Sequence, residues 1–294
     1  MRCRFYWLVL SAIVAFQAAA ETSPAPGKPR VRWMTVDFPP LFMASRHGEG
    51  VGDQAQRAVM AHLEAYEHVL EAVPPNYQRI EQELKNHADV CFAGFLKTPA
   101  RERFMVFSEP YLLMLPVQLY VPAQRPQPPS GPGGQVDLQA ILAQGGFRLG
   151  VLGGRRYEPA VDTLIDAYAD TPAVYRRYSK DQLAGLINMM TSHEHGVDGV
   201  LASPSEINYL HAGSHGGAVD LRGYPLKGMP PFVLGYFACS ASDMGREVIQ
   251  RIDQAIPALR AQAAQRYARD LPADLRAIYD QLLRRQWGFA LAPE

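Results

Sequence analysis

The segment from Asp89 to Tyr111, DVCFAGFLKTPARERFMVFSEPY, places the guanidinium of Arg101 where it could bind an anion. The pattern predicts a buried strand, a loop that opens at 97–99, a charged turn around Arg101 and a second apolar segment. In open α/β sheets, small ligands bind beyond the carboxyl ends of the strands. Because a planar guanidinium can donate two parallel hydrogen bonds to a carboxylate, Arg101 predicts the capture of a small anionic molecule.

Two other groups of residues offer alternative chemistry. Side chains that could converge on a zinc ion are His193, Glu194, His195, His211 and His215. However, the stretch 192–196 is typical of an exposed loop, and the spacing fixes no tetrahedral set of ligands. Glu109 and Glu206 could act as acid and base, but the sequence has no Gly-x-Ser-x-Gly elbow, HExxH motif or phosphate loop. We therefore expect no catalytic residue, no metal and no cofactor.

The ends and the composition indicate an exported two-domain protein. Residues 1–20 have the layout of a cleavable secretory signal, with a basic start at Arg2 and Arg4, an apolar run over 5–16 and cleavage after Ala20. That run is short for a membrane span. The whole chain balances 29 Lys and Arg against 29 Asp and Glu, so it lacks the basic excess of a nucleic-acid-binding protein. The remaining length is enough for two compact domains.

Two cysteines remain after the signal, Cys91 and Cys239, and both lie in apolar, strand-like runs. Cysteine behaves as a small apolar residue in protein cores, so the sequence favours buried free thiols. An exported protein can hold a disulfide, and a bridge is possible if the two strands are neighbours.

Strand-like and helix-like segments alternate along the chain, which predicts an α/β fold. A proline- and glycine-rich stretch over 123–134 indicates an exposed loop or linker. Expected strands are 31–36, a segment from 89, 115–121, 147–152, 197–201 and 232–239; expected helices are 53–70, a segment from 80, 137–145, 157–169, 181–190, 242–259 and an amphipathic tail over 271–283. The order of these elements predicts that one domain is inserted into the other.

The run from Asp89 to Tyr111 resembles the signature of type II periplasmic solute-binding proteins, in particular the family 3 group that includes polar amino acid receptors. Segments that fit the order of that family are FRLGVL over 147–152, GVDGVL over 196–201 and SDMG over 242–245. The resemblance covers nearly all of the mature chain and is closest to a less characterised branch. It implies a two-lobed α/β clamshell with two crossover strands, in which lobe one is 30–121 plus 224–294 and lobe two is 122–223.

The resemblance also implies roles for single residues. Arg101 matches the arginine that binds the ligand carboxylate, and Phe38 matches an aromatic residue that covers the ligand. Tyr77 falls near a second aromatic wall. Thr98 and the backbone around Gly94 match positions that supply hydrogen bonds.

Three positions in lobe two depart from the family pattern. Ser203 stands where amino acid receptors usually have an acidic partner for the ligand amine, and Glu206 one turn later is a weaker substitute. Arg155 and Arg156 add positive charge at an expected helix start, which favours anions by about 0.3–1 kcal/mol; either could instead point to solvent. The departures predict a ligand more acidic than a zwitterion, such as a di-acid or an acidic amino acid.

The expected function is periplasmic binding of a small anionic or amino-acid-like solute for ABC-type uptake. The partners would be the small-molecule ligand and a membrane permease, with no nucleic acid, and the protein would be a monomer. Two alternatives stay open: a sensing protein that feeds a membrane signalling receptor, and a dehydratase-like enzyme on the same fold.

Overall fold

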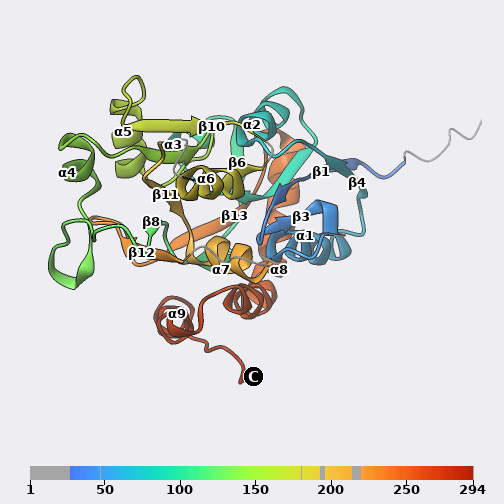
Figure 1. The fold of residues 1–294 in the computed structure, drawn as a ribbon. Coiled ribbons are helices and arrows are strands. Elements are labelled where there is room, and N and C mark those ends of the chain that lie inside the picture. The colour runs from blue at the N-terminus through green and yellow to red at the C-terminus, as the bar shows by residue number, and fades with distance from the viewer. Residues whose placement is uncertain (1–26, 47, 180, 193–195, 214–219, 294) are drawn as a thin grey trace, which may run out of the picture.

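The computed structural model describes residues 27–46, 48–179, 181–192, 196–213 and 220–293. The expected signal segment lies outside this range. The described residues form two lobes, each built on its own sheet, and the chain passes between them twice, at 115–117 and 226–232 (Figure 1). No described helix combines the length and the apolar character that a membrane span requires.

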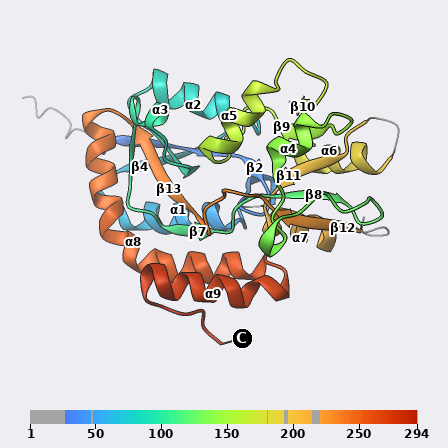
Figure 2. The same cartoon turned by 90° about the vertical axis from the view of Figure 1, so that its left-hand side faces the viewer.

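Lobe one is built on a mixed sheet in the order β4-β1-β5-β13-β6, with β7 also pairing with β13. The strands are β1 (Arg30–Thr35), β4 (Glu67–Ala72), β5 (Val90–Phe95), β6 (Met105–Phe107), β7 (Leu112–Met114) and β13 (Val233–Ser240). The helices around it are α1 (Val51–His62), α2 (Tyr77–Asn86), α3 (Pro99–Glu102), α8 (Asp243–Arg269) and α9 (Ala273–Trp287). Helices α1 and α8 pack together, whereas α2 and α3 lie across the sheet from them (Figure 2).

A short hairpin and the strand β4 differ from the expected elements. The hairpin of β2 (Asp37–Phe38) and β3 (Phe42–Met43) leads through the 3-10 turn η1 (Ala44–Arg46) toward α1. Helix α1 ends at His62 instead of about residue 70, and His68 lies in β4. Parallel pairing of β4 along β1 is a non-local interaction that overrides the local helix pattern.

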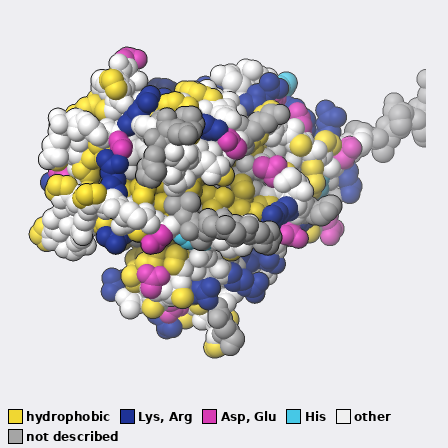
Figure 3. Space-filling view, in the orientation of Figure 1, with side chains coloured by type: hydrophobic (Ala, Val, Ile, Leu, Met, Phe, Trp, Pro, Cys, Tyr) yellow, Lys and Arg dark blue, Asp and Glu magenta, His cyan; other side chains and the backbone are white. Residues whose placement is uncertain are grey.

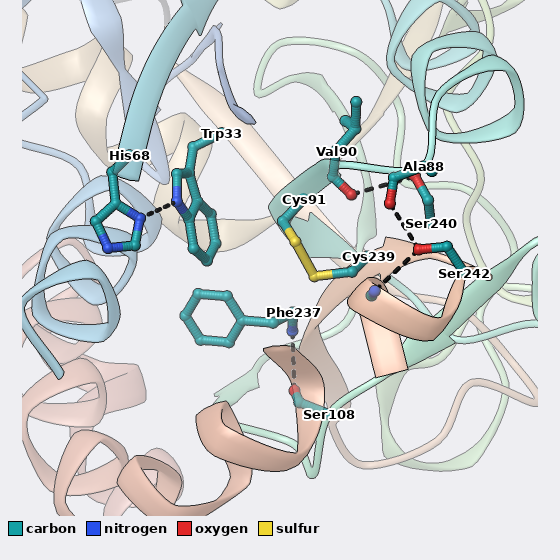
Figure 4. The surroundings of a disulfide bond; sticks show 11 residues. Trp33, His68, Ala88, Val90, Cys91, Ser108, Phe237, Cys239, Ser240 and Ser242 are labelled. Atoms are coloured by element: carbon teal, nitrogen blue, oxygen red, sulfur yellow. Dashed lines mark hydrogen bonds between the residues drawn. A yellow bond between two sulfur atoms is a disulfide. The ribbon is translucent and has the colours of Figure 1, made fainter. Parts of the chain in front are cut away.

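The cysteines form a disulfide, so the expectation of free thiols is wrong. Cys91 on β5 and Cys239 on β13 stand directly opposite each other in an antiparallel pair, with Cα atoms 4.1 Å apart. Figure 4 shows the bridge between the two strands, beside Trp33 and Phe237. The bonded residues are 148 positions apart in the sequence, and residue spacing alone does not reveal that their strands are neighbours.

Lobe two is built on a sheet in the order β10-β9-β11-β8-β12. Its strands are β8 (Gln118–Pro122), β9 (Leu149–Leu152), β10 (Val174–Arg177), β11 (Gly199–Ala202) and β12 (Leu221–Pro225). Its helices are η2 (Pro132–Gly134), α4 (Leu138–Ala143), α5 (Pro159–Ala167), α6 (Gln182–Thr191) and α7 (Pro204–Gly213). Successive strand residues pack into two separate cores on opposite faces of the sheet. One core contains side chains of α4 and α5, and the other contains side chains of α6 and α7.

Both β8 and β12 belong to the sheet of lobe two, which differs from the division drawn from the sequence. That division left residues 118–121 and 224–225 in lobe one, whereas the strands pair with each other in the second sheet. The sequence pattern of an apolar strand next to a crossover does not reveal its sheet, because the strand is covered on both faces in either lobe.

The lobes touch through specific side chains as well as through the crossovers. The Gln182 amide donates a hydrogen bond of 2.9 Å to the carbonyl of Pro75 across the cleft. The guanidinium of Arg46 lies 5.8 Å from the ring centre of Tyr209. These contacts describe a conformation in which the lobes meet on both sides of the cleft.

Candidate functional site

A cavity of about 90 Å³ lies between the lobes, where the carboxyl ends of β5, β9 and β11 converge. Hydrophobic side chains also show in the recessed centre of the face in Figure 3. Lobe one contributes the wall residues Leu41, Phe42, Tyr77, 93–96, Tyr111, Leu112, Met114, Leu115, Val233, Gly235 and Tyr267; lobe two contributes Val117, 155–158, Ser203, Ser205 and Met229. The position agrees with the general location of ligand sites in open α/β sheets.

A buried ion pair occupies the lobe-two wall. Arg155 follows β9 and the Gly153–Gly154 turn, and Gly154 has a φ of 77° that favours glycine. Glu206 lies in the first turn of α7, just after β11. The two groups form a fork, Nη1 to Oε1 at 2.7 Å and Nη2 to Oε2 at 3.0 Å, and their side chains are 16% and 15% exposed.

The surroundings keep both members of this pair charged. Burial raises the pKa of the Glu206 carboxyl, but the charge of Arg155 and hydrogen bonds from Arg155 and Ser203 outweigh burial, so the pKa lies below its ordinary value. Burial acts in the opposite direction on the Arg155 guanidinium, and the neighbouring carboxylate again prevails and raises its pKa. The site therefore presents a fixed dipole instead of a lone positive charge.

Ser203 orients the glutamate. Its backbone N–H and its hydroxyl donate to Oε2 of Glu206 at 2.8 and 2.9 Å. The Ser203 hydroxyl also lies 3.1 Å from that of Ser205, which in turn hydrogen-bonds to Tyr267 on α8. Ser203, expected at the position of an amine partner, thus lines the cavity and supports a carboxylate from the next helical turn.

Phe38 and Tyr77, the two expected aromatic walls, stack directly on each other. Their ring centres are 4.3 Å apart and the planes differ by 9°. Behind them lies a second chamber of about 180 Å³, and Tyr77 and Arg155 line both chambers. The stack and the ion pair therefore lie between two spaces, which we call the inner cavity (about 90 Å³) and the outer chamber (about 180 Å³).

Arg101 has contacts that do not support its expected role as the ligand anchor. Its Nε and Nη2 bind Oε1 of Glu81 at 3.0 and 2.9 Å, and its Nη1 donates to the carbonyl of Leu96 at 2.9 Å. Its guanidinium also packs 4.5 Å from the centre of the Phe95 ring. The side chain is 5% exposed and does not line the described cavity, whose wall beside it is formed by Leu96. Glu81 neutralises Arg101, and the sequence pattern gave no sign of that carboxylate.

The remaining expected site residues lie at different depths. Gly94 lines the cavity, and a Cβ there would stand 2.6 Å from ring atoms of Phe42 and of Phe92, which explains the glycine. Thr98 lies outside the wall and caps α3, accepting from the N–H of Arg101. Arg156 reaches the cavity edge, but its side chain is 52% exposed and pairs with Asp166 at 3.5 Å.

Sequence reasoning missed most of the apolar wall, which comes from segments far apart in the chain. Met114, Val233 and Met229 flank the two crossovers. Val233 falls in an expected strand, and the other two lie outside the expected strands. Tyr111 and Tyr267 direct their hydroxyls to backbone groups, at Ala93 and Leu115. The position of Met114, Val233 and Met229 next to the two crossovers could have identified them as wall residues, because the segments that join two lobes border the cleft between the lobes.

Metal binding has no support within the described residues, where no group of three or more His, Cys, Asp or Glu side chains could hold an ion. His193, Glu194, His195 and His215 of the alternative zinc set lie outside them. His211 is on α7, away from both chambers of the cleft.

Comparison with solved structures identifies the fold. A histidine kinase sensor domain with similarity to periplasmic binding proteins is 14% identical and has a TM-score of 0.60, over 90% of this chain and 98% of that one. A putative L-cystine ABC transporter protein from Listeria monocytogenes is 14% identical with a TM-score of 0.61, over 84% and 97%. The GluR0 ligand-binding core in complex with L-glutamate is 14% identical with a TM-score of 0.59, over 84% and 100%.

No protein-family model and no curated protein matches the sequence. The structural likeness nevertheless extends over the whole length of the compared proteins. The chain has the two-lobed fold of type II periplasmic binding proteins, as the resemblance of Asp89 to Tyr111 predicted.

Proposed function

We propose that the protein binds a small amino-acid-like solute between its lobes and delivers it to a membrane permease after export to the periplasm. The observation that carries this proposal is Arg155 in the wall of the interlobe cavity, paired with Glu206, which lines the adjoining chamber. Withdrawing two charges from water costs several kcal/mol per ion before their attraction is counted. A fold gains little stability from such a pair, so its place in a cavity wall favours a role in recognition.

The pair can recognise both ends of an amino acid. Oε1 of Glu206 accepts a hydrogen bond from Nη1 of Arg155, and a carboxylate oxygen has room for a second donor. Among the described residues, Glu206 is the hydrogen-bond acceptor of the Arg155 guanidinium, which has further N–H groups to donate. An ammonium on Glu206 and a carboxylate on Arg155 would complete both groups.

Lobe closure supports this use. The cavity is bordered by both lobes, which already contact each other through Gln182 and Pro75, so a solute held there touches both walls. A solute that contacts both walls then favours the closed state by its additional contacts. Delivery to a permease is the use implied by the sequence resemblance, and the Listeria neighbour is described as part of an ABC transporter.

Thermal unfolding of the mature chain with each common amino acid tests the proposal. A ligand at about 100 times its Kd adds about 2.7 kcal/mol of stability, which corresponds to a rise of several degrees in Tm. The double variant Arg155→Met/Glu206→Gln leaves no buried charge unpaired and should lose the response. Arg79→Gln, at an arginine that is 61% exposed and lines neither chamber, is the control and should keep it. The absence of any response in the wild type, or a full response in the double variant, would contradict the proposal.

A further inference from the structure

The inner cavity has a wall that is apolar apart from its rim. Lobe one surrounds it with Leu41, Leu96, Leu112, Met114 and Val233, and lobe two adds Val117 and Met229. Three of the four tyrosines in the wall have their hydroxyls engaged with the backbone: Tyr111 donates to Ala93 at 2.6 Å, the N–H of Leu115 donates to Tyr267 at 3.0 Å, and the N–H of Leu152 donates to Tyr157 at 3.4 Å. Their rings, and not their polar ends, are left to contact a ligand. The ring of the fourth, Tyr77, stacks on Phe38.

Charged groups gather where the inner cavity meets the outer chamber. Arg155 lines both spaces, and its partner Glu206 faces the outer chamber together with Asp37 and Asp181. A ligand with its ammonium toward these carboxylates and its carboxylate on Arg155 would direct its side chain into the apolar cavity. The charged groups of such a ligand and its side chain would therefore occupy different parts of the site.

The charge balance of the wall argues against an acidic side chain. The charged side chains described around the inner cavity are Arg155, Arg156 and Glu158, and Glu206 neutralises the first of them. At the edge, Arg156 pairs with Asp166 at 3.5 Å, and Glu158 is a further carboxylate. A zwitterion adds no net charge to this wall, whereas a side-chain carboxylate would be withdrawn from water opposite leucine and methionine without a partner.

The size of the cavity limits the side chain. One water molecule needs about 10–15 Å³ of this kind of volume, so a cavity of about 90 Å³ holds about six to nine water-sized groups. The side chain, α-carbon and carboxylate of leucine, about eight non-hydrogen atoms together, match this capacity when the ammonium lies outside it toward Glu206.

From these observations we infer that the ligand is a zwitterionic amino acid with an aliphatic side chain of about leucine's size, held by its charged groups at Arg155 and Glu206. The inference rests on the proposed function and names the ligand class for the same cleft. It replaces the acidic ligand expected from the sequence, because Glu206 neutralises Arg155 and Glu81 neutralises Arg101.

Isothermal titration calorimetry of the mature chain tests the inference with L-leucine, L-glutamate and L-arginine, and with two leucine analogues that each lack one charged group, 4-methylpentanoate and 3-methylbutylamine. Leucine should bind at least tenfold tighter than each of the others. Equal or tighter binding of glutamate or arginine would overturn the inference while leaving the proposed function intact. Equal binding of either analogue would overturn the zwitterion requirement.

A pair of variants of the apolar wall separates the side-chain contact from folding. Met114 is partly exposed on β7, so a polar replacement of similar shape is compatible with the fold. Met114→Gln should weaken leucine binding about tenfold, and the volume-conserving Met114→Leu should keep it within about threefold. Unchanged leucine affinity in a folded Met114→Gln variant would overturn the placement of the side chain. Failure of all amino acids to bind the wild type would overturn the proposed function itself.

Discussion

Loss of the disulfide should destabilise lobe one far more than a contact of two small side chains would. Cys91 and Cys239 join the strands that precede and follow the whole of lobe two, so the bond closes a loop over a separation of 148 residues. In the chain-entropy treatment, a loop of this length restricts the unfolded state by about 5 kcal/mol. That value is an upper bound, because residual structure in the unfolded chain reduces it.

Guanidinium unfolding of the mature chain, with and without prior reduction under denaturing conditions, measures this term. The reduced wild type retains both sulfur atoms, so the comparison contains no cavity contribution. The expected loss of unfolding free energy is about 3–5 kcal/mol, with an earlier transition for lobe one. Lobe two has its own cores and should change little. The variant Cys91→Ala/Cys239→Ala should reproduce the loss, with an added cost for removing two buried sulfurs.

Two results would refute the reasoning. One is the titration of two free thiols in oxidised, denatured wild-type protein, which would mean that the bond does not form. The other is an unchanged unfolding midpoint after complete reduction, which would mean that the closed loop contributes nothing to the stability of lobe one.

Further predictions concern Arg101, Asp270 and Gln182. Arg101→Met should cost about 3 kcal/mol of stability, because it leaves Glu81 unpaired. The double variant Arg101→Met/Glu81→Gln should regain at least half of that stability and still bind ligand. A stable double variant that does not bind ligand would restore Arg101 as the anchor. Burial raises the pKa of Asp270 from 3.8 to about 6, so its ionisation lowers stability as the pH rises between these values. Asp270→Asn should therefore add about 1 kcal/mol to the free energy of unfolding at pH 7 and nothing near pH 4, as measured by denaturant titration. An equal gain at both pH values would contradict this prediction. Gln182→Ala removes a contact between the lobes and should weaken ligand binding several-fold in calorimetry with little change in Tm, whereas a large loss of Tm would assign the contact to folding.

The sequence predicted the architecture because its signals are local. Alternating apolar strands and capped helices specify an α/β fold, and Ser242 caps α8 and Asp137 caps α4, at the starts of two expected helices. The segment from Asp89 to Tyr111 added the two-lobed arrangement by its resemblance to a known signature. Element ends were less accurate: β4 replaced the end of a predicted helix because its pairing partner, β1, is distant in the sequence.

The chemistry of the cleft depended on contacts between distant residues, which the sequence does not reveal. Arg101 and Glu81 are 20 positions apart, and Arg155 and Glu206 are 51 apart. Each arginine by itself suggested an unpaired positive charge, and together they suggested an acidic ligand. The pairing of each with a glutamate reverses the electrostatic argument, because a neutralised cleft favours a ligand without net charge.

Native mass spectrometry of the mature protein, incubated with an equimolar mixture of amino acids and desalted, tests the central claim most directly. We expect one bound molecule per chain with the mass of an aliphatic amino acid. The folded variant Arg155→Met/Glu206→Gln should retain none. A wild-type spectrum without any bound amino acid, or the same adduct on the variant, would contradict the claim that this pair and the cavity beside it form the binding site.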